Sequence, residues 1–340
     1  MTARTFVDRP AARERVPLLL GLVGPSGGGK TFSALRLATG IQRVSGGDIF
    51  VVDTEARRAL HYADRFKFRH VDFGAPFGSL DYLAAIQYCV GKGAGVVVVD
   101  SMSHEHEGPG GLLEQHEAEA ARLAKQWGTR IETAKMAAWA APKAARRRLI
   151  NSVLQLPCNF VFCFRAKEKL KIKRGEDPQH LGFMAIAGEE FVFEMNVNAL
   201  LLPGAGGVPT WQSDEVGERQ QIKLPGWARE MFGDRPLDEQ TGEALARWAA
   251  GTIVRTSAQL VEAYAACVTP AALGPLEVER KALWRSATTD EKTALKAAAD
   301  AAKARVEAIA NEPPPGALAS DPPTEPAPNS PEDVGFERGD

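Results

Sequence analysis

The chain has 340 residues, of which 44% are hydrophobic and 25% charged, and its formal net charge is −2. This length allows one large domain plus a small one, with enough apolar side chains for a sizeable core. The near-zero net charge excludes proteins whose overall basicity draws them to nucleic acid, so local charge decides that question. The four cysteines form no C-x-x-C pair, which indicates a reducing compartment such as the cytoplasm.

An arm, a strand, a glycine-rich loop and a helix follow one another at the N-terminus. Residues 1–15 are polar, and the apolar run after them is too short for a signal peptide or a membrane-spanning helix, so we expect no membrane contact. A buried strand is predicted at 16–23 and a helix at 32–44. The loop between them matches the P-loop pattern G-x-x-x-x-G-K-[ST] with Gly24, Pro25, Ser26, Gly27, Gly28, Gly29, Lys30 and Thr31.

This strand–loop–helix context predicts a specific chemistry for the loop. Glycines let backbone N–H groups turn toward an anion, and the N-terminus of the next helix adds a partial positive charge. Lys30 would reach the β and γ phosphates of ATP, and the Thr31 hydroxyl would hold Mg²⁺. Together with Phe32, the loop is the predicted nucleotide site. A plain glycine-rich turn would leave the lysine and the threonine at these positions unexplained.

Glu55 follows a second buried strand, predicted at 49–53. We expect this strand to lie next to the P-loop strand, which would let Glu55 reach the γ-phosphate and orient or deprotonate the attacking water. Asp53 is the alternative residue for that role. The structural alternative for Glu55 is an acidic residue favoured at a helix N-terminus.

Asp100 ends a further strand, directly after four consecutive valines. An acid at this place is the second signature of P-loop proteins and holds the Mg²⁺ shell, whereas the structural alternative is an aspartate that caps a turn. Strands alternating with helices predict an α/β fold whose central sheet is mostly parallel and flanked by helices. Ligands of such sheets lie at the carboxyl ends of the strands, where the P-loop, Glu55 and Asp100 should converge.

A polar stretch at 102–111 contains the run His104, Glu105, His106 and Glu107. Two histidines with two carboxylates are residue types that bind zinc, but no distant cluster of further ligands accompanies them. We therefore favour a mobile polar loop near the nucleotide or DNA over a structural zinc site. Arg146, Arg147 and Arg148 lie in a predicted helix that starts at Pro142, and we expect them on a solvated face, with DNA contact as the alternative.

A basic segment follows the next predicted strand, at 159–164. Arg165 or Lys167 would sense the γ-phosphate at the carboxyl end of that strand. The remaining cations would bind a nucleic-acid backbone, or else protect an edge strand from pairing. They are Lys169, Lys171, Lys173 and Arg174.

The C-terminal part changes in composition. One or two strands at 191–202 and a helix at 237–249 complete a first domain at 16–250, and 251–257 is a candidate linker. Residues 258–310 predict a small unit of two or three helices. Residues 311–340 are rich in proline, serine and acids, which is typical of a disordered tail that recruits a protein partner.

The order of these motifs resembles the RecA-like ATPase core, over about residues 16–205, and is closest to the compact RecA-like ATPases of bacteriophages. The resemblance implies that Glu55 is the catalytic glutamate and that Asp100 and Ser101 form the Asp–Ser pair of the Mg²⁺ strand. It also implies two loops that contact single-stranded DNA, at about 102–111 and 166–188. Phe164 and Arg165 depart from the family, which has an Asn–Gln pair there to sense the γ-phosphate.

This resemblance implies a Mg²⁺-dependent, DNA-stimulated ATPase that binds single-stranded DNA and promotes annealing or strand exchange in recombination. We expect a homo-oligomer, ring or filament, in the cytoplasm of a bacterial host if a phage encodes it. The alternatives are a P-loop DNA motor of the helicase or packaging type, a small-molecule kinase, and a nucleotide-dependent binding protein with negligible turnover.

Overall fold

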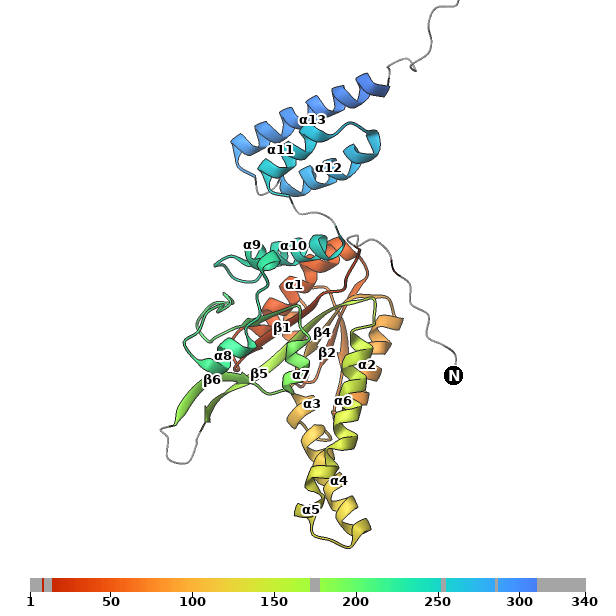
Figure 1. Ribbon diagram of the computed structural model, residues 1–340, viewed down its shortest axis with the longest axis vertical. Helices are drawn as coiled ribbons and strands as arrows, with labels where there is room; N and C mark the ends of the chain where they lie inside the picture. The colour runs from red at the N-terminus through yellow and green to blue at the C-terminus, as the bar shows by residue number, and fades with distance from the viewer. Residues whose placement is uncertain (1–7, 9–13, 172–177, 252–254, 285–286, 311–340) are drawn as a thin grey trace, which may run out of the picture. The chain divides into compact units, whose positions relative to one another are not determined.

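The computed structural model describes residues 8, 14–171, 178–251, 255–284 and 287–310 (Figure 1). The chain divides into two compact units, 1–254 and 255–340, and each is described by itself. The division falls inside the stretch expected as a linker. The tail expected at 311–340 and most of the N-terminal arm lie outside the described residues.

A seven-stranded sheet forms the first unit, and its main path runs β3-β2-β4-β5-β1-β7. All pairs on this path are parallel, and β6 pairs antiparallel with the distal half of β5. The predicted α/β fold with a mostly parallel sheet is therefore confirmed. The strands are β1 (Leu19–Gly24), β2 (Asp48–Asp53), β3 (Arg69–Asp72), β4 (Ala94–Asp100), β5 (Asn159–Lys171), β6 (Gln179–Ala185) and β7 (Val197–Leu200).

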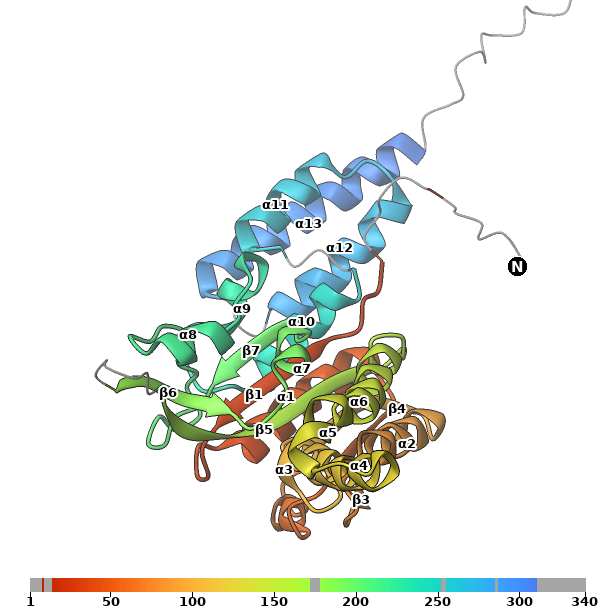
Figure 2. The same ribbon diagram turned by 60° about the horizontal axis from the view of Figure 1, so that its bottom comes forward.

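Helices cover both faces of the sheet (Figures 1 and 2). Successive side chains of a strand point to opposite faces, so Leu19 of β1 packs in one hydrophobic core while Leu20 packs in the other. The helices α2 (Ser79–Gly91) and α6 (Ala140–Val153) contribute to the first core, and α1 (Lys30–Ser45) and α10 (Glu239–Ala249) contribute to the second. Burial on both faces explains why the central strands are continuous apolar runs.

Short helices fill the connections of the first unit. The segment after β2 contains the 3₁₀ turn Arg58–Tyr62, and the stretch 191–202 begins inside a helix rather than a strand. The helices α4 (Leu112–Trp127) and α5 (Ile131–Ala138) form a hairpin that extends away from the sheet (Figure 1). The remaining helices are α3 (His104–Glu107), α7 (Glu189–Phe193), α8 (Val216–Gln221) and α9 (Arg229–Phe232).

The second unit, in its described residues, consists of α11 (Ser257–Ala266), α12 (Pro270–Leu283) and α13 (Thr289–Ala310). Leu260, Tyr264 and Leu295 are fully buried and form its small core. Thr256 begins α11 with a capping box in which its side chain and that of Gln259 bond each other's backbone. These three helices lie in the stretch for which the sequence predicts two or three helices.

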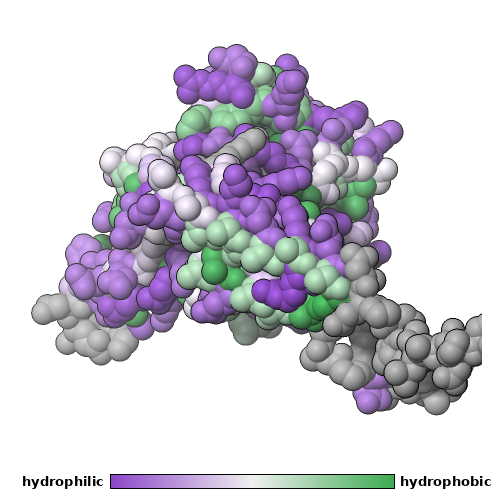
Figure 3. All heavy atoms as spheres, turned by 90° about the horizontal axis from the view of Figure 1, so that it is seen from above, coloured by the Kyte–Doolittle hydropathy of each residue, from purple (hydrophilic) through white to green (hydrophobic). Residues whose placement is uncertain are grey.

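The surface drawn in Figure 3 is largely hydrophilic, with smaller hydrophobic areas between the polar side chains. Among the described residues, we find no helix that combines the length and the apolar character needed to span a membrane.

Candidate nucleotide-binding site

The predicted P-loop joins the end of β1 to the first residue of α1. Gly27 and Gly29 have φ angles of 82° and 81°, in the left-handed region that favours glycine. A Cβ atom on Gly24 or Gly28 would lie 2.2 or 2.4 Å from the carbonyl oxygen of Leu201, so a larger residue does not fit at either position. Both backbone conformation and close packing therefore account for four glycines of the motif.

Lys30 is 9% exposed and lies inside the turn of the loop. Its Nζ donates hydrogen bonds to the carbonyl oxygens of Gly24 at 2.9 Å and Pro25 at 2.8 Å. Burial lowers the pKa of Lys30, and the nearby Asp100 and Glu55 act in the opposite direction. Because its partners in the loop are neutral carbonyls, the ammonium group would gain interaction energy by exchanging them for phosphate oxygens.

Thr31 and Asp100 meet although 69 residues separate them. The Thr31 hydroxyl donates a 2.5 Å hydrogen bond to Oδ2 of Asp100, whose exposed fraction is 5%. Burial raises the pKa of Asp100 to about 6, against the hydrogen bond from Thr31, which lowers it. A hydroxyl and a carboxylate are oxygen ligands of the kind that Mg²⁺ takes in proteins, so these two residues fit the ion.

Glu55 lies at the same edge of the sheet, but the strand before it does not occupy the predicted position. We expected β2 beside the P-loop strand, and this expectation is wrong, because β5 and β4 lie between β1 and β2. Strands that are consecutive in the chain need not pair, and here β5 returns from far along the chain to occupy the position next to β1. The charge of Glu55 nevertheless affects the pKa values of both Lys30 and Asp100.

The side chain of Glu55 is 17% exposed and contacts two arginines. Its Oε1 lies 3.8 Å from Nε of Arg165, and its Oε2 lies 3.5 Å from Nη1 of Arg58. By contrast, Asp53 is 1% exposed, and its carboxylate accepts the backbone N–H groups of Glu55 and Ala59. Asp53 thus fixes the turn after β2, and Glu55 is the carboxylate left to act at the site.

The DNA-contacting loop expected at 166–188 is largely a pair of strands. The strand β5 continues seven residues past the predicted end at 164, to Lys171, and pairs with β6. We call this pair, residues 165–171 with 179–185, the β5–β6 arm (Figures 1 and 2). Lys167 forms an ion pair with Glu107 at 3.2 Å, while Lys169 and Lys171 are exposed. Lys173 and Arg174 lie outside the described residues.

The polar stretch after Asp100 is likewise not simply a loop, because it contains α3. Each of its four side chains has a partner: His104 contacts Thr54 and Arg165, Glu105 and His106 contact Arg146, and Glu107 contacts Lys167. In the described part of the chain, no group of three or more histidine, cysteine or acidic residues could hold a metal ion. The alternative of a zinc site at 104–107 therefore has no support. The four side chains of α3 instead form polar contacts with neighbouring elements.

Arg146 corrects another expectation, that its helix face is solvated. It is 3% exposed, and its guanidinium pairs with the buried Glu105 through contacts of 2.7 and 3.1 Å. The hydroxyl of Ser79 also donates to Glu105. Packing of α6 next to α2 and α3 buries this arginine, whereas Arg147 and Arg148 are exposed as predicted. No local sequence pattern predicts the pair of Arg146 and Glu105, because 41 residues separate them.

Phe32 lies in an aromatic cluster directly after the P-loop. Its ring centroid is 5.5 Å from that of Phe66 and 5.8 Å from that of Tyr62. Both partners follow Glu55 in the chain, so the cluster ties the start of α1 to the segment after β2. No sequence pattern distinguished this role from the nucleotide contact that we expected for Phe32.

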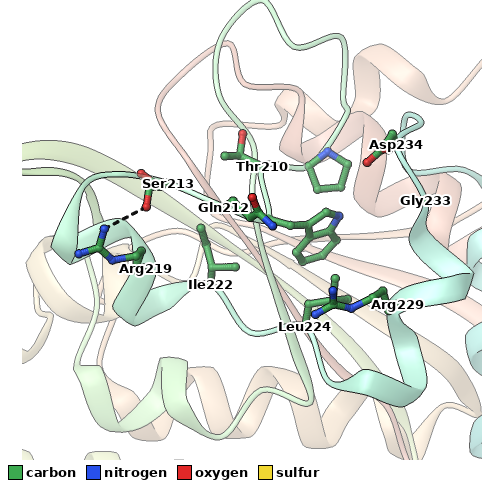
Figure 4. Close-up of a pocket in the computed structure, with 11 residues that line it drawn as sticks. Thr210, Gln212, Ser213, Arg219, Ile222, Leu224, Arg229, Gly233 and Asp234 are labelled. Carbon is green, nitrogen blue, oxygen red and sulfur yellow. Dashed lines mark hydrogen bonds between the residues drawn. The ribbon is translucent and has the colours of Figure 1, made fainter.

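An open pocket of about 940 Å³ lies elsewhere in the first unit (Figure 4). Its walls come from residues 209–213, with Arg219, Ile222, Leu224, Arg229, Gly233 and Asp234. Arg219 bonds the backbone of Ser213 at its rim. None of these residues belongs to the P-loop, so we place the candidate nucleotide site at the loop and not in this pocket.

No protein-family model matches the chain, and a search of the curated proteins finds no match either.

Proposed function

We propose that this protein is a RecA-like, Mg²⁺-dependent ATPase that binds single-stranded DNA and promotes annealing or strand exchange. The observation that carries the proposal is the meeting of four chemically distinct side chains at the carboxyl edge of the parallel sheet. Lys30 and Thr31 follow β1, Asp100 ends β4, and Glu55 follows β2. A cation, a hydroxyl, a buried acid and a partly exposed acid at one edge are what hydrolysis of a nucleoside triphosphate requires.

Each residue has a separate task in this proposal. The P-loop backbone and Lys30 bind the phosphates, and Thr31 and Asp100 hold Mg²⁺, which supplies positive charge against the phosphate oxygens. Glu55 accepts the proton of the attacking water. A kinase would direct the phosphate to another acceptor, whereas the partly exposed Glu55 carboxylate favours water as the nucleophile.

The β5–β6 arm supports the choice of DNA as the partner. Arg165, at the base of the arm, contacts Glu55, and the exposed Lys169 and Lys171 lie farther out on the same strand. Cations in a row along an extended strand fit the phosphates of a single-stranded backbone. We further propose a homo-oligomer, ring or filament, acting in the cytoplasm, with the acidic tail available to a protein partner.

ATP hydrolysis measured with and without single-stranded DNA tests the proposal. We expect the wild type to hydrolyse ATP faster when DNA is present, and Lys30→Ala to lose hydrolysis in both conditions. Lys125→Ala, a change of an exposed lysine on α4, is the matched control and should behave as the wild type. Particle size with a nonhydrolysable ATP analogue reports assembly. An ATPase rate that single-stranded DNA leaves unchanged would argue against the proposal.

A further inference from the structure

His104 of α3 lies between two polar partners, one directly after β2 and the other on β5. Its Nδ1 is 2.8 Å from the hydroxyl oxygen of Thr54, which follows β2, and its Nε2 is 3.3 Å from Nη1 of Arg165 on β5. The ring of Phe77 stacks on the imidazole, with centroids 5.0 Å apart and planes inclined by 26°. These contacts fix both the position of the ring and the direction of its two nitrogens.

Hydrogen-bond counting determines which nitrogen of His104 carries the proton. The hydroxyl of Thr54 donates its single proton to the carbonyl oxygen of Ser101 and accepts the backbone N–H of Ser101. Toward His104 this hydroxyl can therefore only accept, so Nδ1 is the donor and Nε2 presents a lone pair to Arg165. Burial also lowers the pKa of His104, in agreement with a neutral ring.

Arg165 is thereby held between a neutral acceptor and a carboxylate. Its Nη1 faces Nε2 of His104, and its Nε faces Oε1 of Glu55 at 3.8 Å. Its backbone N–H donates to the hydroxyl of Ser103, the residue before His104, at 2.8 Å. The side chain of Arg165 remains 45% exposed, so an incoming phosphate group can reach it without unfolding the site.

We propose that His104 is a positioning residue that keeps Arg165 against Glu55 until DNA binds the β5–β6 arm. In this position Arg165 faces Oε1 of Glu55, so that this oxygen is occupied and not free to accept the proton of the attacking water. A DNA phosphate that draws Arg165 away would free Glu55 for the attacking water. The inference rests on the proposed function, and it assigns the origin of DNA stimulation to one contact between α3 and the base of the arm.

Three substitutions of His104 separate this role from a purely structural one. His104→Ala removes both hydrogen bonds of the ring, so we expect the DNA-free kcat to rise about fivefold, the size expected when one exposed ion pair is weakened. The stimulation by single-stranded DNA should then fall toward one. His104→Asn places an amide donor at Nδ1 and keeps only the Thr54 partner, so it should resemble alanine. His104→Gln places an acceptor near Nε2 and should restore stimulation.

The combined change with Arg165→Ala tests whether His104 acts through the arginine. If it does, the double substitution has the same DNA-free kcat as Arg165→Ala alone, because interacting residues are not additive. His116→Ala, on α4, is the matched histidine control and should keep wild-type stimulation. The Nε–Hε resonance of Arg165 in nucleotide-free protein gives a readout independent of activity. It should shift in the alanine and asparagine variants and return toward the wild-type position in the glutamine variant.

These experiments distinguish failure of the proposed function from failure of the role assigned to His104. A wild type without DNA-stimulated hydrolysis overturns the proposed function together with this inference. A stimulated wild type whose alanine and asparagine variants keep the same stimulation and the same Arg165 resonance overturns the inference alone, as does an additive double substitution.

Discussion

The hydroxyl of Thr31 and the carboxylate of Asp100 share a 2.5 Å hydrogen bond that joins the first turn of α1 to the end of β4. The strand β5 lies between β4, which carries Asp100, and β1, which leads into α1, so the bond spans β5 at the carboxyl edge of the sheet. Together, they form the part of the site that fits Mg²⁺.

Removal of the Thr31 hydroxyl should weaken the use of Mg²⁺. For Thr31→Ala, we expect the Mg²⁺ concentration that gives half-maximal ATP hydrolysis to rise about 10- to 100-fold. Thr31→Ser keeps the hydroxyl and should stay near the wild type. Thr39→Ala, farther along α1, is the control, because the Thr39 hydroxyl donates to the carbonyl of Leu35 within the same helix. A Mg²⁺ requirement that Thr31→Ala does not change would contradict this role.

Removal of Arg146 should destabilise the first unit strongly. Arg146→Ala leaves the buried Glu105 carboxylate without its cation, and breaking such a pair costs about 3–5 kcal/mol of the free energy of unfolding. Urea unfolding measures the change. The neighbouring Arg147→Ala, on the exposed face of α6, should stay within about 0.5 kcal/mol of the wild type. If both substitutions lower the free energy of unfolding equally, the buried pair contributes no more to stability than an exposed arginine does.

His106 should make stability depend on pH. Burial is the largest cause that lowers the pKa of His106, and the nearby Arg146, whose Nη2 donates to Nδ1 at 2.9 Å, acts in the same direction. Because the pKa is depressed on folding, the unfolded chain binds more protons below its ordinary value of 6.5. The stabilising contribution is therefore complete above pH 6.5 and is lost as the pH falls below it.

The substitution His106→Asn isolates this contribution, because its amide oxygen still accepts from Arg146 but does not titrate. We expect the free energy of unfolding of the variant to fall less between pH 7 and 5 than that of the wild type, by up to about 1.4 kcal/mol for each pH unit. Unfolding curves at several pH values provide the comparison. Parallel losses of stability in both proteins would exclude His106 as a source of the dependence.

The exposed lysines of the β5–β6 arm should determine affinity for single-stranded DNA. Lys169→Ala combined with Lys171→Ala should weaken binding of a labelled oligo(dT). The slope of the logarithm of affinity against the logarithm of salt concentration should become shallower by about 0.7 for each phosphate that the arm no longer neutralises. The control combines Lys125→Ala with Lys135→Ala, two exposed lysines of the α4–α5 hairpin. If both pairs of substitutions have the same effect, the arm is not the DNA-binding element.

Local patterns predicted the parts of this site that are close together in the chain. The P-loop and Asp100 were found because each directly follows a buried apolar run, and such runs identify strands of a parallel sheet. The predicted position of β2 beside β1 was wrong, because no single sequence pattern reveals the order of strands in a sheet. Strand pairing depends on contacts such as that of Leu19 with Phe160, far apart in the chain.

Contacts between distant polar residues were also beyond prediction. Arg146 and Glu105 each look like surface residues in their own helices, and only their pairing makes burial of both favourable. The extension of β5 does have a local signal, since Lys169, Leu170 and Lys171 alternate in polarity as strand residues do. Cations dominate the segment, however, and they favoured a DNA-binding loop over the edge strand that this alternation indicates.

ATP turnover by Glu55→Gln, measured beside the wild type with saturating Mg²⁺, ATP and single-stranded DNA, tests the central claim most directly. Glutamine keeps the size of the side chain but cannot accept the proton of water, so we predict ATP binding close to that of the wild type and a kcat lower by about 10²- to 10⁴-fold. A Glu55→Gln variant that hydrolyses ATP at the wild-type rate would contradict the assignment of this site as a hydrolytic one.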